Sequence, residues 1–207
     1  MNLDKLKKKI MSKEKILLFL LGILIIGIIF GSFLVVVLNK TDKNLITSYL
    51  ETYLSNVENN KLDYKTGLIN VLISNESYVL VTWLLGISVI GFPLTIMLFF
   101  YKSFAIGFTL SSILMRYKFK GLLLTITYLF PHHAINIALY LYLALHSLTT
   151  SFKILKSIIK KETIDFRLII NRYQKSLMIA SVMVVITGLF EIFITPIIIK
   201  TIIILIK

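Results

Sequence analysis

Several polar side chains that could bind an ion or exchange a proton lie inside apolar stretches of this 207-residue chain. Glu191 lies near the middle of the apolar run 177–206, and His132, His133 and Asn136 lie near the middle of another, 121–146. A carboxylate at the centre of a membrane helix costs about 2.5 to 3.5 kcal/mol unless it is paired, protonated or faces a polar cavity. Glu191 therefore needs a partner. His132 and Asn136 are the candidates because residues four apart share one helix face, whereas His133 points about 100° away.

The cluster of His132, Asn136 and Glu191 has two interpretations. It is either a proton or ion site, or a hydrogen-bonded clamp that fixes the packing of two helices. Three prolines are expected to break or bend helices: Pro93, Pro131 and Pro196. Because two of these prolines lie beside the cluster, and because such bonds have a modest net worth, we favour the clamp and keep the ion site as the alternative.

The residue types that common enzyme sites require do not occur together in this sequence. There is no cysteine, no His-Glu-x-x-His metal motif, no Gly-x-Ser-x-Gly nucleophile motif and no phosphate-binding loop. The three histidines lack a second carboxylate for a metal site, and the apolar runs contain no pair of aspartates. We therefore expect no catalysis, no bound metal and no cofactor.

The elements that must position these residues are apolar helices. Hydrophobic residues make up 57% of the chain and charged residues only 16%, whereas roughly a quarter of a soluble domain is charged. Five apolar runs cover more than half of the chain: 16–38, 78–101, 103–115, 121–146 and 177–206. Most are long enough to cross a bilayer as helices and too long for barrel strands. The sequence predicts an all-α, polytopic membrane protein with about five transmembrane helices, in which the short run 103–115 either spans or re-enters.

The distribution of lysine and arginine predicts the orientation of these helices. The tail 1–15 carries six lysines and the stretch 147–176 carries seven basic residues, whereas four lysines in the loop 39–77 are offset by five acidic residues. Basic loops stay in the cytoplasm, so we expect a cytoplasmic N-terminus, an outer loop at 39–77 and an outer C-terminus. The net charge of +13 is expected to meet anionic lipid through an amphipathic cytoplasmic linker at 147–176, not nucleic acid.

The outer loop 39–77 contains an apolar stripe at helical spacing. The stripe includes Tyr49, Tyr53 and Val57, which form the candidate partner surface. A helix packed on the spans or on the membrane surface is favoured, and a dedicated docking helix is the alternative.

Two glycines in the first run, Gly27 and Gly31, form a Gly-x-x-x-Gly pair. Such a pair lies on one face and lets a second helix approach closely. Two glycines at this spacing also occur by chance in a span, so the sequence leaves both interpretations open.

Several short elements together resemble the stage II sporulation protein M family of integral membrane proteins. They are Asn75, Gly86, the segment 91–93, the Phe-Ala-Ile-Gly-Phe segment 104–108, Pro131-His132, and the Glu-Ile-Phe-Ile-Thr-Pro segment 191–196. The Pro-His and Glu-x-x-x-Thr-Pro elements are the specific ones, and the matches extend along nearly the whole chain after the first run. Family members often have a glutamate where this chain has Asn136, a difference that argues against a proton relay and leaves the clamp intact.

The resemblance implies a non-catalytic membrane partner of a machine that degrades the cell wall in endospore formers. In that family the protein works with a lytic transglycosylase and an amidase/endopeptidase at the septal membrane during engulfment. It thus implies a scaffold that holds peptidoglycan hydrolases at the septal or engulfing membrane of the mother cell. Membrane lipids and further copies of the chain are the other expected partners. The alternative function is a membrane subunit of a transporter or channel, indicated by Glu191, His132 and the broken helices.

Overall fold

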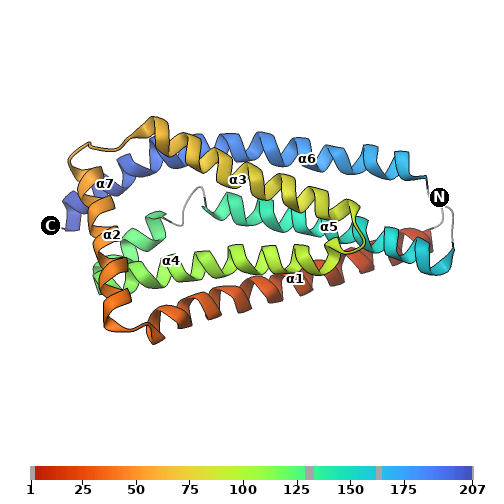
Figure 1. Cartoon of the computed structure of the whole chain (residues 1–207), viewed down its shortest axis with the longest axis horizontal. Helices are drawn as coiled ribbons and strands as arrows, with labels where there is room; N and C mark the ends of the chain where they lie inside the picture. The colour runs from red at the N-terminus through yellow and green to blue at the C-terminus, as the bar shows by residue number, and fades with distance from the viewer. Residues whose placement is uncertain (1–2, 129–132, 162–164, 207) are drawn as a thin grey trace.

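The computed structural model describes residues 3–128, 133–161 and 165–206, and the regular structure within these ranges is helical throughout. Five spans are long and apolar enough to cross a membrane: Lys13–Val37, Tyr64–Ile87, Gly91–Lys118, Ala134–Lys160 and Phe166–Ile202. They run back and forth along the long axis of the molecule (Figure 1). The prediction of an all-α polytopic membrane protein is therefore confirmed.

The helices follow one another with short connections. In chain order they are α1 (Leu3–Val37), α2 (Lys40–Glu58), α3 (Tyr64–Ile87), α4 (Gly91–Tyr128), α5 (Ala134–Lys160), α6 (Phe166–Leu189), the π-helical segment η2 (Phe190–Ile194) and α7 (Thr195–Ile206). Helix α2 crosses one end of the bundle, where α7 also lies, and is oriented across the long helices (Figure 1). We call this end of the molecule the α2 end.

Helices α1 and α4 pack closely because glycines replace side chains at their contact. A Cβ atom added to Gly31 would lie 2.0 Å from a backbone oxygen of α4, and one added to Gly107 would lie 2.2 Å from a backbone oxygen of α1. Gly27 faces α4 as well, since its Cβ would lie 2.6 Å from Ser103. Of the two interpretations of the Gly-x-x-x-Gly pair, the structure supports the packing face.

The boundaries of the second and third spans differ from the expectation of a span at 78–101 followed by a short one at 103–115. A turn at 88–90 divides the apolar run, so that α3 ends at Ile87 and α4 begins at Gly91. The reversal is tight enough that a Cβ atom on Gly91 would lie 1.6 Å from the oxygen of Leu85. Pro93 lies in the first turn of α4, where its missing N–H costs no hydrogen bond. It therefore starts a helix where a break within one was expected.

Carbonyl groups at and just before this turn accept hydrogen bonds from side chains of other helices. Ser147 donates to the oxygen of Thr82 at 3.0 Å and Ser151 donates to that of Ser88 at 2.8 Å. The hydroxyl of Tyr173, on α6, donates to the oxygen of Trp83 at 3.1 Å. Because unsatisfied carbonyls are costly in lipid, these bonds explain how a sharp turn persists between two apolar helices.

The linker expected at 147–176 is instead mostly helix. Helix α5 continues to Lys160 and α6 begins at Phe166, so the connection is far shorter than expected. The expected fourth and fifth spans at 121–146 and 177–206 are shifted accordingly, to Ala134–Lys160 and Phe166–Ile202. The reason is that the serines and threonines after position 146 do not mark a loop. Ser147 and Ser151 donate to backbone oxygens at the end of α3, and Thr149 and Thr150 donate to backbone oxygens of α5 itself.

The re-entrant feature lies later in the chain than the sequence suggested. Gly91–Lys118 is long enough to span, and the chain then turns at Lys118, whose φ of 48° and ψ of −129° are not helical. The last part of α4 turns back toward the middle of the bundle from the α2 end (Figure 1). The sharp bend therefore follows the basic residues Arg116 and Lys118 and does not lie within 103–115.

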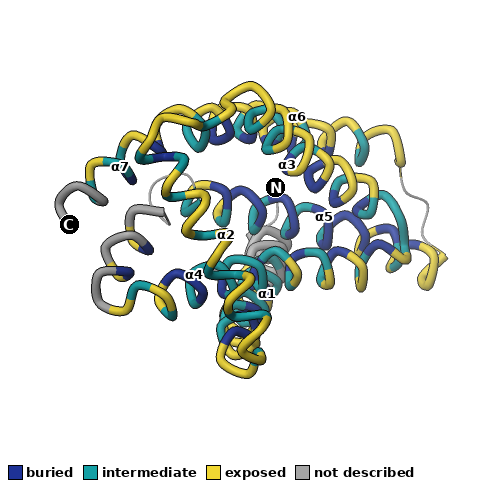
Figure 2. The backbone as a smooth tube through the Cα atoms, turned by 60° about the vertical axis from the view of Figure 1, so that its left-hand side comes forward, coloured by how far each residue is buried: buried dark blue, intermediate teal, exposed yellow. Residues whose placement is uncertain are grey.

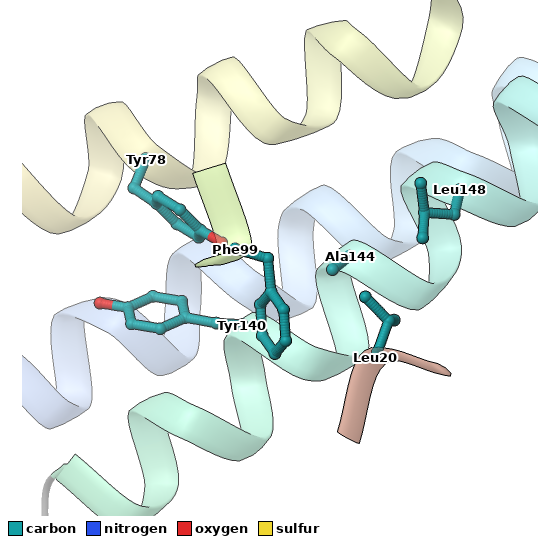
Figure 3. Packing of buried hydrophobic residues seen from close by; sticks show 6 residues of the cluster. All are labelled: Leu20, Tyr78, Phe99, Tyr140, Ala144 and Leu148. Atoms are coloured by element: carbon teal, nitrogen blue, oxygen red, sulfur yellow. The ribbon is translucent and has the colours of Figure 1, made fainter. Parts of the chain in front are cut away.

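The core is formed where four helices meet. Leu20 of α1, Tyr78 of α3, Phe99 of α4, and Tyr140, Ala144 and Leu148 of α5 form one buried cluster (Figure 3). Buried residues are frequent along α5, whereas α1, α3 and α6 turn exposed residues outward (Figure 2). The outward faces of α1 and α6 carry large hydrophobic side chains, as expected for helices in contact with lipid.

Candidate functional site

Two cavities adjoin inside the bundle. The first, which we call the apolar cavity, has a volume of about 430 Å³ and lies at the α2 end between α2, α3, α4 and α7. The second, which we call the polar cavity, has a volume of about 310 Å³ and is lined by residues of α3, α4 and α5. Four residues line both cavities: Asn70, Val71, Thr109 and Glu191. Glu191 therefore lies at the boundary between an apolar space and a polar one.

A single lysine lies at the middle of α4 and lines the polar cavity. The Nζ atom of Lys102 is 5.2 Å from the ring centroids of both Tyr78 and Tyr140, a distance at which a cation is attracted to an aromatic face. These two rings pack edge to face at 4.6 Å, and the hydroxyl of Tyr140 donates to Oδ1 of Asn75 at 2.8 Å. The lysine is thus held by aromatic rings that are themselves fixed by packing and a hydrogen bond.

Lys102 and Glu191 are the two oppositely charged residues among the described lining of the polar cavity. Both line it, and their opposite charges attract one another. An isolated charge in the hydrocarbon region is expensive, so such residues usually pair within the bundle. The sequence indicated that Glu191 needs a partner but offered His132 and Asn136, because Lys102 was taken as the charge that separates two apolar runs. Its position as a lone charge between two such runs was the available signal.

The structure describes some of the other residues that were expected in the cluster. Asn136 is buried, lines the polar cavity, and accepts a hydrogen bond at 2.7 Å from Thr187 of α6, which is also buried. His132 and Pro131 lie outside the described residues. His133, which was expected to point away, lines the polar cavity. The structure thus brings Asn136, His133 and Glu191 to one cavity and adds Lys102 to them.

Next to Pro196 the helix changes from α-helical to π-helical winding. Glu191 lies on the π-helical segment Phe190–Ile194, and Pro196 follows in the first turn of α7. Proline cannot donate the usual helical hydrogen bond, and a π-helical turn widens the backbone at such a place. The hydroxyl of Thr195 donates to the oxygen of Phe190 at 3.5 Å. The wider turn therefore coincides with the carboxylate at the boundary of the two cavities.

Replacing Thr187 by valine is expected to lower the free energy of unfolding by about 1 to 3 kcal/mol, because it leaves the buried amide oxygen of Asn136 without this donor. Thermal and denaturant unfolding of the purified protein would measure the change. Thr201→Val is the control, since Thr201 is exposed and its hydroxyl binds only its own helix at 3.0 Å. Equal stabilities of the two variants would contradict a stabilising hydrogen bond between Thr187 of α6 and Asn136 of α5.

The three residues of the expected partner surface on α2 differ in their exposure. Val57 is 2% exposed and packs in a cluster with Ile113 and Ile199, so it is not accessible to a partner. Tyr53 lines the apolar cavity and is 38% exposed. Its pKa is raised, chiefly by burial and also by the charge of Glu191. Tyr49 is 72% exposed and is the most exposed of the three.

Polar contacts connect α2 and the segment after it to α4 and α7. Arg116 of α4 forms an ion pair with Glu51, in which Nε donates to Oε1 at 2.8 Å. After the end of α2, Oδ1 of Asn60 accepts a hydrogen bond at 2.8 Å from Nζ of Lys200 on α7. Together with the packing of Val57, these contacts hold α2 in place as one wall of the apolar cavity.

The sequence of the chain matches a described protein family. The family described as stage II sporulation protein M matches residues 16–196, which is most of the chain. Neither the curated proteins nor the solved structures give a match. Among the described residues, no group of three or more histidine, aspartate or glutamate side chains could hold a metal ion.

Proposed function

The chain belongs to the stage II sporulation protein M family, and from this membership and the arrangement of α2 we propose that it is a non-catalytic membrane scaffold that recruits peptidoglycan hydrolases during sporulation. The membership itself makes it a sporulation-related membrane protein. The proposal adds a finer role. In it, the protein holds a transglycosylase and an amidase/endopeptidase at the septal or engulfing membrane of the mother cell.

The observation that carries the proposal is the fixed position of α2. The helix is bound to α4 through Glu51 and Arg116, and the segment after it is bound to α7 through Asn60 and Lys200. Its other face leaves Leu45 and Tyr49 50% and 72% exposed. Rigid presentation of apolar and aromatic side chains lowers the entropic cost of binding and is typical of interface anchors.

The proposed orientation places the α2 end outside the cytoplasm. The end opposite to α2 is formed by the last part of α5 and the start of α6 (Figure 1). The basic residues of these segments are Lys153, Lys156, Lys160, Lys161 and Arg167. An excess of basic residues marks the cytoplasmic side. In this orientation α2 faces the compartment that contains peptidoglycan and its hydrolases.

The test is capture of hydrolases by the full-length protein from sporulating cells, followed by identification of the bound enzymes. Replacing both Leu45 and Tyr49 by serine is expected to reduce capture of the peptidoglycan hydrolases about ten-fold, because loss of one anchor residue commonly costs that much affinity. Both side chains are exposed, so the fold should persist, as circular dichroism and thermal unfolding would verify. The hydrolases should also lose their septal localisation.

The matched control replaces two exposed apolar residues at the opposite end, Ile158 and Ile159, by serine. These residues are expected to be dispensable for capture. If the α2 variant and the control capture the hydrolases equally well, α2 is not the recruiting surface. Because the chain has no cysteine, labelling of Tyr49→Cys in intact cells by a membrane-impermeant thiol reagent tests the orientation separately.

A second candidate function is a transporter or channel subunit, and one observation favours it. Lys102 and Glu191 line one cavity between the spans, and Glu191 lies on the π-helical segment. Transport sites often lie near the bilayer midplane where helices are irregular. Flux across proteoliposomes that contain the purified chain would support this role, and recruitment of hydrolases without flux would support the scaffold.

A further inference from the structure

The charges inside the polar cavity balance one another. Among its described lining residues, Lys102 supplies a cation and Glu191 an anion, and the remaining polar groups are amides, hydroxyls and the imidazole of His133. In a region of low dielectric, a guest with a net charge would leave one charge uncompensated, which is strongly unfavourable. The guest that fits this cavity is therefore neutral overall. The two opposite charges favour a guest that carries both an anionic and a cationic group.

The order of the groups along the bundle gives the orientation of such a guest. On α4, Tyr117 and Ile113 line the apolar cavity, Thr109 lines both cavities, and Lys102 lines the polar one. The rise per residue of a helix places Lys102 about 22 Å from Tyr117 along α4. Glu191 lies at the boundary. From the α2 end inward, the site thus presents apolar walls, then a carboxylate, then an ammonium group.

We propose that the two cavities form one binding site for a zwitterion of the α-amino acid type with an apolar side chain. The side chain occupies the apolar cavity, the ammonium group binds Glu191, and the carboxylate binds Lys102. In an α-amino acid the side chain, the ammonium group and the carboxylate branch from one carbon, so one small molecule presents all three groups to the two adjoining cavities. The cavity volumes of about 430 and 310 Å³ lie in or near the range of small-molecule sites.

Other side chains complete the polar part of the site. Asn136 and Asn75 line the polar cavity, and their oxygens are engaged by Thr187 and Tyr140 respectively. Because each amide oxygen is an acceptor already in use, the amide nitrogens remain as donors suited to a carboxylate. Lys102 and these two amides therefore surround the position assigned to the anionic group. The site neither requires nor excludes the recruitment of hydrolases, and the two proposals stand or fall separately.

The test compares three probes on the purified full-length protein in nanodiscs. L-leucine is the zwitterion, its methyl ester is a cation and N-acetyl-L-leucine is an anion, all with the same side chain. We expect L-leucine to bind at least about ten-fold more tightly than either derivative, measured by equilibrium binding and by the thermal shift. Equal affinity for the three probes, or no binding by any of them, would overturn the proposal.

Variants of the charge pair sharpen this test. Lys102→Met leaves a net negative site and is expected to shift the preference about ten-fold or more toward the methyl ester, and Glu191→Gln to shift it toward the N-acetyl form. A general loss of folding would not invert selectivity in two opposite directions. Lys65→Met, at an exposed residue that lines neither cavity, should leave the selectivity unchanged.

A second readout does not depend on the stability of the charge variants. The chain has no cysteine, so Thr109→Cys places a single thiol at the boundary of the two cavities. L-leucine should slow its reaction with a small thiol reagent at least about ten-fold at saturation, and the two derivatives should not. Unchanged labelling in the presence of L-leucine would show that the site lies elsewhere and would overturn the proposal.

Discussion

Replacement of Gly31 by leucine is expected to lower the free energy of unfolding by about 3 kcal/mol or more, or to prevent assembly of the bundle. Overpacking of a tight contact commonly costs about 1 to 3 kcal/mol, and more where the backbone must move. A Cβ atom at Gly31 would lie 2.0 Å from the oxygen of Phe104 and 2.8 Å from the nitrogen of Phe108. Both neighbours are backbone atoms of α4, so no side-chain rotation can relieve the overlap.

The same helix provides a matched control. A Cβ atom at Gly22 would meet no atom within 4 Å, so Gly22→Leu adds the same side chain to α1 without an overlap. Thermal unfolding of the two variants in detergent, with expression in the membrane as a second measure, would separate packing from the general effect of a leucine in this span. If Gly31→Leu is as stable as Gly22→Leu, then α1 and α4 do not pack as the structure shows.

The interface of α1 and α4 shows what a sequence can predict and where it stops. The Gly-x-x-x-Gly pair of Gly27 and Gly31 is readable as a surface for close approach, and the structure bears this out. The partner was not readable, because Gly107 is a single glycine without a spacing motif and lies 76 positions further along the chain. Contacts of this kind depend on which helices are neighbours, and a local pattern carries no information about that.

The span boundaries were misplaced for a related reason. Hydropathy predicted that the chain is a helical membrane protein, but it cannot distinguish one long helix from two helices joined by a buried turn. At 88–91 the turn is closed by Gly91, and the carbonyl of Ser88 accepts a hydrogen bond from Ser151, which lies 63 positions further along the chain. Similarly, the polar first turns of α3 were assigned to a loop, although Tyr64–Ile87 as a whole is apolar enough to span.

The candidate site was predicted in part. The need of Glu191 for a partner followed from the cost of a carboxylate in the membrane, and the structure places it with Asn136 at one cavity. Lys102 was missed because a lone lysine between two apolar runs normally marks the end of a span. Lys102 lies within a helix and not at a span boundary only because the turn at 88–90 makes α4 begin at Gly91. The error in the site therefore follows from the error in the boundaries.

Lys102→Met is expected to lower the free energy of unfolding by up to about 3 to 5 kcal/mol, because it removes the one cation that lines the polar cavity beside Glu191 among the described lining residues. Glu191→Ala is expected to lower stability and assembly for the corresponding reason, with Lys102 then uncompensated. The double variant Lys102→Met with Glu191→Met should recover most of the loss, since it removes both charges. A double-mutant cycle from denaturant unfolding measures this coupling.

An exposed ion pair in the same chain provides the control. Arg116 and Glu51 have side chains that are 46% and 48% exposed, and such pairs contribute about 0 to 1 kcal/mol. Arg116→Met should therefore cost much less than Lys102→Met, although each removes one cation from α4. If the two substitutions cost the same, Lys102 is as well solvated as a surface residue. The polar cavity would then be an aqueous space without the charge balance on which a neutral guest depends.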